Sequence, residues 1–139
     1  MTDNDFTDPD TIKDIIDDSQ IIAVVGLSDK PNRASHGVAS YLKREGYTVI
    51  PVNPNKDIIL GEKSYPNLKS IPQPIDLVDI FRRSDAVGPI VDEAISIKAK
   101  AVWLQQDVIN HDAAKKAADA GLKVVMNRCL FLEHTKLKS

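Results

Sequence analysis

Short apolar runs alternate along the chain with segments whose apolar residues recur every three or four positions. Each run has the length of a strand, and an uninterrupted apolar run is typical of a strand buried on both faces of a sheet. The pattern predicts five strands, over residues 21–25, 47–52, 75–81, 101–104 and 122–126. It predicts helices that begin at Asp8-Pro9, over 37–45, 87–97 and 112–120, and a short polar helix after Arg128.

Strands that alternate with helices in this way are joined by right-handed crossovers, which give a parallel sheet with helices on both faces. We therefore expect an α/β fold: a single domain with a doubly wound, five-stranded parallel sheet in the order 3-2-1-4-5. The 139 residues divide into an acidic N-terminal helix (1–19), a core (20–130) and a C-terminal tail (131–139). Ligands of such sheets bind beyond the carboxyl ends of the strands.

The composition favours a folded protein in a reducing compartment. Hydrophobic residues make up 42% of the chain and charged residues 27%. No apolar run approaches the ~20 residues of a membrane span, and the first residues lack the pattern of a secretory signal. The one cysteine cannot form an internal disulfide. These features predict a cytoplasmic protein without a membrane segment.

The net charge of −2 is unevenly distributed. The first twenty residues hold seven Asp and one Lys, and the rest of the chain holds 17 basic and 13 acidic side chains. An acidic leader of this kind is interpreted as a solvated helix, while the remaining excess of basic charge could favour a small anion. The balance is far from that of a dedicated nucleic-acid domain, so no nucleic-acid partner is expected.

The loop after the first strand is a candidate phosphate site. Gly26 permits a tight turn, and a helix that begins near Ser35 directs free N–H groups toward the same edge of the sheet. Ser28 and Arg33 can supplement these donors. The loop matches neither GxGxxG nor a P-loop, so an ordinary polar crossover loop is an equal alternative.

The ends of the next two strands extend this candidate site. Asn53-Pro54 follows the second strand, where an NAD site usually has an acidic residue, so this tip argues against NAD and tolerates a phosphorylated ribose. Phe81 precedes Arg82 and Arg83, which suit an anion clamp, and the ring could stack on a base. The alternatives are a plain Asn-Pro turn, a core phenylalanine and solvated arginines.

The residues give no catalytic or metal constellation. The three histidines lack metal-ligand spacing, and Asp76 and Asp79 stand three apart in a strand, on opposite faces. Cys129 is more readily explained as a packed side chain than as a reactive thiol. The residues thus predict a protein that binds a phosphorylated, nucleotide-like ligand without catalysis and without a metal.

Four segments, over 23–54, 75–87, 101–105 and 120–129, resemble the small CoA-binding proteins of bacteria and archaea. These proteins are similar to the N-terminal CoA-binding domain of the succinyl-CoA synthetase α subunit. The resemblance covers 20–130 and implies a Rossmann-like fold that binds coenzyme A. The resemblance implies that Gly26, Leu27, Ser28 and Arg33 lie near the pyrophosphate, and Ser35 is added because it stands at the start of the helix. It also implies that the ligand contacts Asn53 and Pro54 at the tip of the second strand, and Phe81, Arg82 and Arg83 near the adenosine.

Two positions depart from the family pattern. Asp107 stands where the family usually has glycine, and Asn127 where it often has aspartate, both beside the expected path of the pantetheine arm. The expected function is a non-catalytic module for CoA or acyl-CoA, acting as a carrier, sensor or regulator, as a homodimer or with an unidentified protein partner. The alternative is an NAD(P)-binding oxidoreductase or redox-sensing regulator of the same fold, with Arg82 and Arg83 on a 2′-phosphate.

Overall fold

A computed structural model describes residues 5–138, so the first four residues of the expected N-terminal helix lie outside the described residues. The central sheet consists of strands β1 (Ile21–Val25), β2 (Thr48–Val52), β5 (Leu77–Ile80), β6 (Ala101–Leu104) and β7 (Lys123–Val125). Five α-helices accompany it: α1 (Pro9–Asp18), α2 (Ala34–Arg44), α3 (Val87–Ser96), α4 (His111–Asp119) and α5 (Leu130–Lys138). Two short strands, β3 (Ile58–Ile59) and β4 (Glu62–Lys63), form a small separate hairpin.

The strands of the central sheet are all parallel and lie in the order β2-β1-β5-β6-β7. This confirms the predicted α/β class and the five-stranded parallel sheet. The third predicted strand, β5, pairs with β1 and β6, so it lies inside the sheet and not beyond β2 as the predicted order required.

The edge beyond β2 is already occupied, which explains the position of β5. Tyr65 forms a parallel bridge with Val52, its N–H donates to the carbonyl of Pro51 at 3.0 Å, and its carbonyl accepts from the N–H of Asn53 at 2.9 Å. Counted as a strand, this single residue is the third along the chain and lies beyond β2, so the segment predicted as the third strand becomes the fourth and pairs with β1. Pro51 faces this outer edge, so its missing N–H removes no bond to β1.

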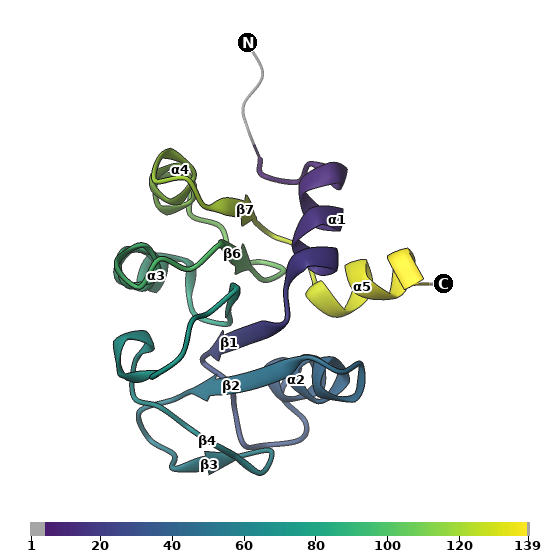
Figure 1. Cartoon of the computed structure of the whole chain (residues 1–139), viewed down its shortest axis with the longest axis vertical. Coiled ribbons are helices and arrows are strands. Elements are labelled where there is room, and N and C mark those ends of the chain that lie inside the picture. Colours follow the sequence, from purple (N-terminus) through teal and green to yellow (C-terminus); the bar gives the residue numbers. More distant parts are fainter. Residues whose placement is uncertain (1–4, 139) are drawn as a thin grey trace.

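Helices cover both faces of the sheet, as Figure 1 shows. On one face α3 and α4 pack over apolar side chains such as Val78 and Val102, and on the other α1, α2 and α5 pack over Val24 and Trp103. Strand residues alternate between the two faces, so every strand needs apolar side chains at successive positions. This is why the strands are recognisable in the sequence as continuous apolar runs.

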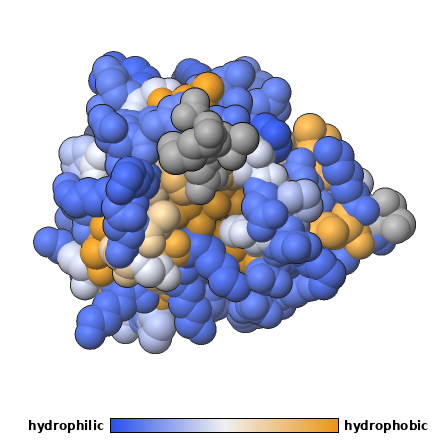
Figure 2. Space-filling view, turned by 90° about the horizontal axis from the view of Figure 1, so that it is seen from above, coloured by the Kyte–Doolittle hydropathy of each residue, from blue (hydrophilic) through white to orange (hydrophobic). Residues whose placement is uncertain are grey.

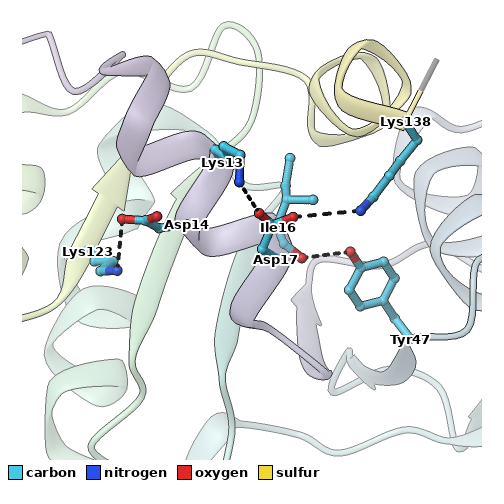
Figure 3. Close-up of polar contacts among 7 residues, drawn as sticks. All are labelled: Lys13, Asp14, Ile16, Asp17, Tyr47, Lys123 and Lys138. Atoms are coloured by element: carbon cyan, nitrogen blue, oxygen red, sulfur yellow. Dashed lines mark hydrogen bonds and ion pairs between the residues drawn. The ribbon is translucent and has the colours of Figure 1, made fainter.

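Helix α1 begins as predicted, because the Asp8 side chain accepts the N–H of Thr11 and Pro9 occupies the first turn. Its apolar face is buried through Ile12, Ile15 and Ile16, and the acidic side chains point outward. Figure 3 shows how the outer face is tied to its neighbours: Lys123 lies near Asp14, and the Tyr47 hydroxyl donates to the carbonyl of Ile16.

Two helices differ from the prediction. Helix α2 starts at Ala34, three residues before the expected 37, because Arg33 has the extended backbone of an N-cap. Helix α5 is not polar: Leu130 is buried, and Phe131, Leu132 and Leu137 are exposed. Figure 2 shows hydrophobic groups gathered at the end of the molecule where α5 lies, within an otherwise largely hydrophilic surface. None of the helices between residues 5 and 138 combines the length and apolar composition that a bilayer crossing needs.

Candidate functional site

A pocket of about 500 Å³ lies at the carboxyl ends of β1, β5 and β6, in front of the first turn of α2. This is the edge where ligands of doubly wound sheets bind. Seven of the ten predicted site residues line it, and six further residues complete the wall. The lining consists of Gly26, Ser28, Arg33, Ala34, Ser35, Val38, Phe81, Arg82, Arg83, Gln105, Gln106, Val108 and Cys129.

Gly26 turns the chain sharply at the end of β1. Its N–H donates to the carbonyl of Val52, and its φ of +85° lies in the left-handed region that side chains disfavour. A Cβ placed there would lie 2.2 Å from the carbonyl oxygen of Phe81 and 3.0 Å from Cδ of Arg82. The glycine therefore lets the β1 turn and the end of β5 approach each other closely at the base of the pocket.

The first turn of α2 contributes hydrogen-bond donors. Arg33 is the N-cap residue and makes no side-chain cap bond. The N–H groups of the first helical residues lack intrahelical partners in any α-helix, here no Arg33 side chain caps them, and the helix dipole adds partial positive charge at this end. Ala34 and Ser35 belong to this turn and line the pocket. A phosphate group is the kind of ligand that such an end binds.

The two serines shape the loop between β1 and α2. The Ser35 hydroxyl oxygen accepts the N–H of Ser28 at 3.0 Å, and the Ser28 hydroxyl oxygen accepts the N–H of Lys30 at 3.1 Å. Ser35 is buried, whereas Ser28 is half-buried. The hydroxyl groups thus fix the loop conformation, so the loop presents its backbone to the pocket in a defined shape.

Three arginines surround the pocket opening, and all three are exposed. Arg83 Nε lies 3.2 Å from Oδ1 of Asp85, in a pair that is open to solvent. Among the described residues, Arg33 and Arg82 make no ion pair. Guanidinium groups bind phosphate in a bidentate manner, so these two positions suit an anionic ligand. Phe81 is half-buried beside them, with part of its ring among the core residues under α2.

The other three predicted site residues lie outside the pocket lining. The Leu27 side chain is fully buried in the core. Asn53 Nδ2 donates to the Leu27 carbonyl at 3.0 Å, and its Oδ1 accepts the N–H of Asn55 at 2.8 Å, so its amide holds the β1 and β2 turns together. Pro54 is exposed at the tip of β2. The residues directly after β2 are thus Asn53, Pro54 and Asn55, and none of these three is acidic.

The additional lining residues lie on elements that the sequence predicts, and their spacing or their place after a strand indicates in part that they reach the pocket. Ala34 and Val38 stand four apart on α2, a spacing that places both on one helix face. Gln105, Gln106 and Val108 follow β6, whose carboxyl end reaches the same edge as those of β1 and β5. Cys129 joins them because β7 runs parallel to β6, and it is half-buried.

The two departures from the family pattern are hydrogen-bonded to each other. Asn127 Oδ1 accepts the N–H of Asp107 at 2.7 Å, which links the loops after β6 and β7. Both residues have positive φ, 71° for Asp107 and 59° for Asn127. Asp107 thus adopts the backbone conformation for which glycine is best suited, and Asn and Asp tolerate it better than most residues.

The two aspartates of the third predicted strand are separated as expected. Asp76 lies at the end of the sheet opposite the pocket, where its Oδ2 accepts the N–H groups of Gln20 and Ile21 at 2.9 Å. Asp79 lies within β5, fully buried, and its Oδ1 accepts from Nε2 of the pocket residue Gln105 at 2.8 Å. Burial raises the pKa of Asp79 to about 7, an effect that the Gln105 hydrogen bond opposes.

The fold and the site define a Rossmann-like α/β protein with a ligand pocket at the carboxyl edge of a parallel sheet. Residues 20–135 match the family model of the CoA binding domain, and the chain belongs to this family. It is 41% identical over 127 residues to the uncharacterized protein YneT of Bacillus subtilis (strain 168), covering 91% of this chain and 94% of that protein.

Solved structures and larger enzymes share this likeness. A hypothetical protein from Pyrococcus horikoshii OT3 has a TM-score of 0.92 and 39% identity, and the match covers 100% of both chains. The acetate–CoA ligase [ADP-forming] I of Archaeoglobus fulgidus is 26% identical over 128 residues, which are 85% of this chain but 19% of that enzyme. The chain therefore corresponds to a small part of such ligases, and their activity belongs to proteins several times longer.

Proposed function

We propose that this chain binds coenzyme A or an acyl-CoA as a non-catalytic module, in the pocket at the carboxyl edge of the sheet. The observation that carries the proposal is the meeting in one pocket of the first turn of α2 with Arg33 and Arg82. Coenzyme A carries a pyrophosphate and a 3′-phosphate, and both are anions that helix N-termini and guanidinium groups bind.

The lining residues can be assigned to three parts of the ligand. Phe81 and Arg83 form the adenosine side, and the turn at Gly26, with Arg33 and with Arg82 beside it, forms the pyrophosphate side. The pantetheine arm then runs toward Gln105, Gln106 and Cys129, which supply amide groups and one thiol. Membership of the CoA binding domain family supports this assignment.

The tip of β2 favours CoA over NAD. An NAD site holds the ribose hydroxyls with an acidic side chain after the second strand. Here Asn53 stands at that point, and its amide is already engaged with the Leu27 carbonyl and the Asn55 N–H. A neutral side chain at this position tolerates a ribose with a 3′-phosphate, which CoA has and NAD lacks, while Lys56 beyond it pairs with Asp29 at 3.2 Å.

The side chains in the pocket support binding without chemistry. The hydroxyl oxygens of Ser28 and Ser35 accept backbone N–H groups, and no histidine or carboxylate among residues 5–138 contacts either of them. A nucleophile needs such a base to be activated. A carrier, sensor or regulator of this kind acts through a partner, which is a second copy of this chain or another protein. We propose that the protein acts in the cytoplasm.

The proposal is tested by thermal unfolding and calorimetry with CoA, acetyl-CoA, NAD and NADP at equal concentrations. A ligand present at 100 times its dissociation constant should add about 2.7 kcal/mol to the free energy of unfolding. CoA and acetyl-CoA should produce this shift and NAD should not. Tighter binding of NAD or NADP than of CoA would contradict the proposal and support the oxidoreductase alternative.

A further inference from the structure

Behind the pocket lies one buried carboxyl group to which the proposed function assigns no task. Asp79 pairs in register with Val24 of β1 and Trp103 of β6, and its exposed fraction is 0%. Its Oδ1 accepts one hydrogen bond, from Gln105, and its Oδ2 is the one buried side-chain atom without a partner among the described residues. A buried polar atom without a partner is costly, so the position calls for a reason beyond packing.

Gln105 connects this carboxyl group to the pocket. Its side chain is 4% exposed, lines the pocket, and donates through Nε2 to Asp79. Its Oε1 accepts no hydrogen bond from residues 5–138, yet it is not among the buried atoms that lack a partner, so it reaches the pocket surface. An ionised carboxylate can only accept, and it therefore holds the amide NH₂ group inward and the amide oxygen toward the ligand.

Protonation of Asp79 makes the opposite arrangement possible. A proton on Oδ1 turns this oxygen into a hydroxyl that can donate to Oε1 of Gln105, which allows the amide to turn its NH₂ group toward the pocket, whereas the ionised carboxylate cannot donate and excludes this arrangement. The proton comes from solvent, and no covalent bond changes. Burial raises the pKa of Asp79 to about 7, so both forms are populated near neutral pH.

No charged group among the described residues forms an ion pair with Asp79 that would favour its ionised form. Burial and the Gln105 hydrogen bond are the influences on its pKa. Within the described residues, the charged and titratable groups on the surrounding elements form no hydrogen bond or ion pair with it, and those of α1 pair at the surface or face solvent. The charged and titratable groups on these elements are Arg82 and Arg83 after β5, Arg33, His36, Tyr41, Lys43 and Arg44 at α2, Tyr47 before β2, Arg128, Cys129, Glu133, His134, Lys136 and Lys138 at α5, and Asp10, Lys13, Asp14, Asp17 and Asp18 on α1.

We propose that Asp79 acts through Gln105 as a specificity-determining residue, which selects whether the pocket offers a hydrogen-bond acceptor or a donor to the acyl end of the ligand. Charged Asp79 presents the amide oxygen, which suits an N–H or S–H group. Neutral Asp79 presents the amide N–H, which suits the carbonyl oxygen of a thioester. The inference rests on the proposed function, and it makes the preference for an acyl-CoA dependent on pH.

The test compares acetyl-CoA with S-ethyl-CoA, a thioether that lacks only the carbonyl oxygen. The ratio of their two dissociation constants cancels the titration of the phosphates, which both ligands share. Between pH 8.5 and pH 5.5 the preference for acetyl-CoA should rise about five- to tenfold, the worth of one hydrogen bond gained and one repulsion removed. A ratio that stays constant over this range overturns the inference.

Two variants isolate the residues. Asp79→Asn keeps the shape but cannot ionise, so its ratio should not change with pH, and Gln105→Leu should bring the ratio close to one at every pH. A ratio that changes as much in Asp79→Asn as in the native chain overturns the inference, even though CoA still binds. If Asp79→Asn does not fold, the native chain and Gln105→Leu decide the question alone. Loss of binding of all CoA derivatives by the native chain refutes the proposed function itself.

Discussion

Three charged side chains of α1, those of Lys13, Asp14 and Asp17, are paired within the protein, whereas two of the three arginines at the mouth of the pocket are unpaired among the described residues. Lys13 lies 2.6 Å and Lys138 3.7 Å from Asp17, and Lys123 lies 3.4 Å from Asp14 (Figure 3). At the pocket, Arg33 and Arg82 have no acidic partner within the described residues. Both regions are exposed to solvent, so they differ in whether their charged side chains have ion-pair partners within the protein, and not in burial.

The two ends of the sheet also differ in how many of their backbone and buried polar groups have hydrogen-bond partners. Asp76, at the end of the sheet opposite the pocket, accepts two backbone N–H groups. At the pocket end, α2 has no side-chain N-cap bond, and Asp79 keeps an unpartnered oxygen. One end of the sheet satisfies its polar groups internally, and the other leaves donors and charge for a ligand at some cost in stability.

The largest predicted effect is the gain in unfolding free energy of Asp79→Asn, which removes the ionisable carboxyl group that is buried in the native chain. The pKa of this group is raised from 3.8 to about 7 on folding, so the folded chain binds its proton more tightly than the unfolded chain. The native stability is therefore fully present below pH 4 and declines as the pH rises to 7. Relative to the native chain, Asp79→Asn should gain up to about 4 kcal/mol of unfolding free energy between pH 4 and pH 8.

Urea unfolding of both proteins across this pH range measures the gain, and Asp76→Asn is the matched control. Burial works against ionisation of Asp76, but the N–H groups of Ile21 and Gln20 lower its pKa below 3.8. Its variant should therefore lose stability at neutral pH and approach the native chain only in acid, the opposite sign. If both variants were destabilised at pH 8, the two ends of the sheet would not differ as described.

The second predicted effect concerns the close approach at Gly26. Gly26→Ala forces a side chain into the left-handed region and into the Phe81 carbonyl, so it should cost about 3 kcal/mol of unfolding free energy and weaken CoA binding more than tenfold. Gly37→Ala, in α2 with nothing near its Cβ, should instead stabilise by about 0.5–1 kcal/mol. Calorimetry on both variants would contradict the first expectation if their affinities for CoA were equal.

The sequence could predict the elements and most of the pocket because both depend on local signals. Continuous apolar runs marked the buried strands, and the residues that follow β1 and β5 were sufficient to place Gly26, Arg33 and Arg82 at one edge. The Tyr65 bridge was not predictable in this way, since a single paired residue has no periodicity. The prediction therefore placed β5 at the edge beyond β2, where Tyr65 lies, whereas β5 pairs with β1 and β6.

The roles of Asn53, Asp79 and Gln105 depended on contacts between distant segments. Asn53 is predicted as a ligand contact, and the structure adds that its amide donates to a carbonyl 26 residues away. Asp79 and Gln105 are also 26 residues apart, and their pairing follows from the register of β5 with β6. The alternation of the strand assigned Asp79 to one face correctly. Only the helices packed over that face determine that the carboxyl group is buried.

The smallest predicted effect, about tenfold in affinity, tests the unpaired arginines directly, because a hydrogen bond to a charged group makes a net contribution of ~1.5–3 kcal/mol. Arg82 Cδ lies beside Gly26, so Arg82→Ala should weaken CoA and dephospho-CoA equally, as expected of a contact to the pyrophosphate. Arg83 stands further along the loop, so Arg83→Ala should weaken CoA alone, through the 3′-phosphate. Arg44→Ala, at the far end of α2, should change neither affinity in calorimetry. Equal effects of Arg44 and Arg82 would mean that the pocket attracts its ligand through overall charge, and not through guanidinium groups that the fold has left unpaired.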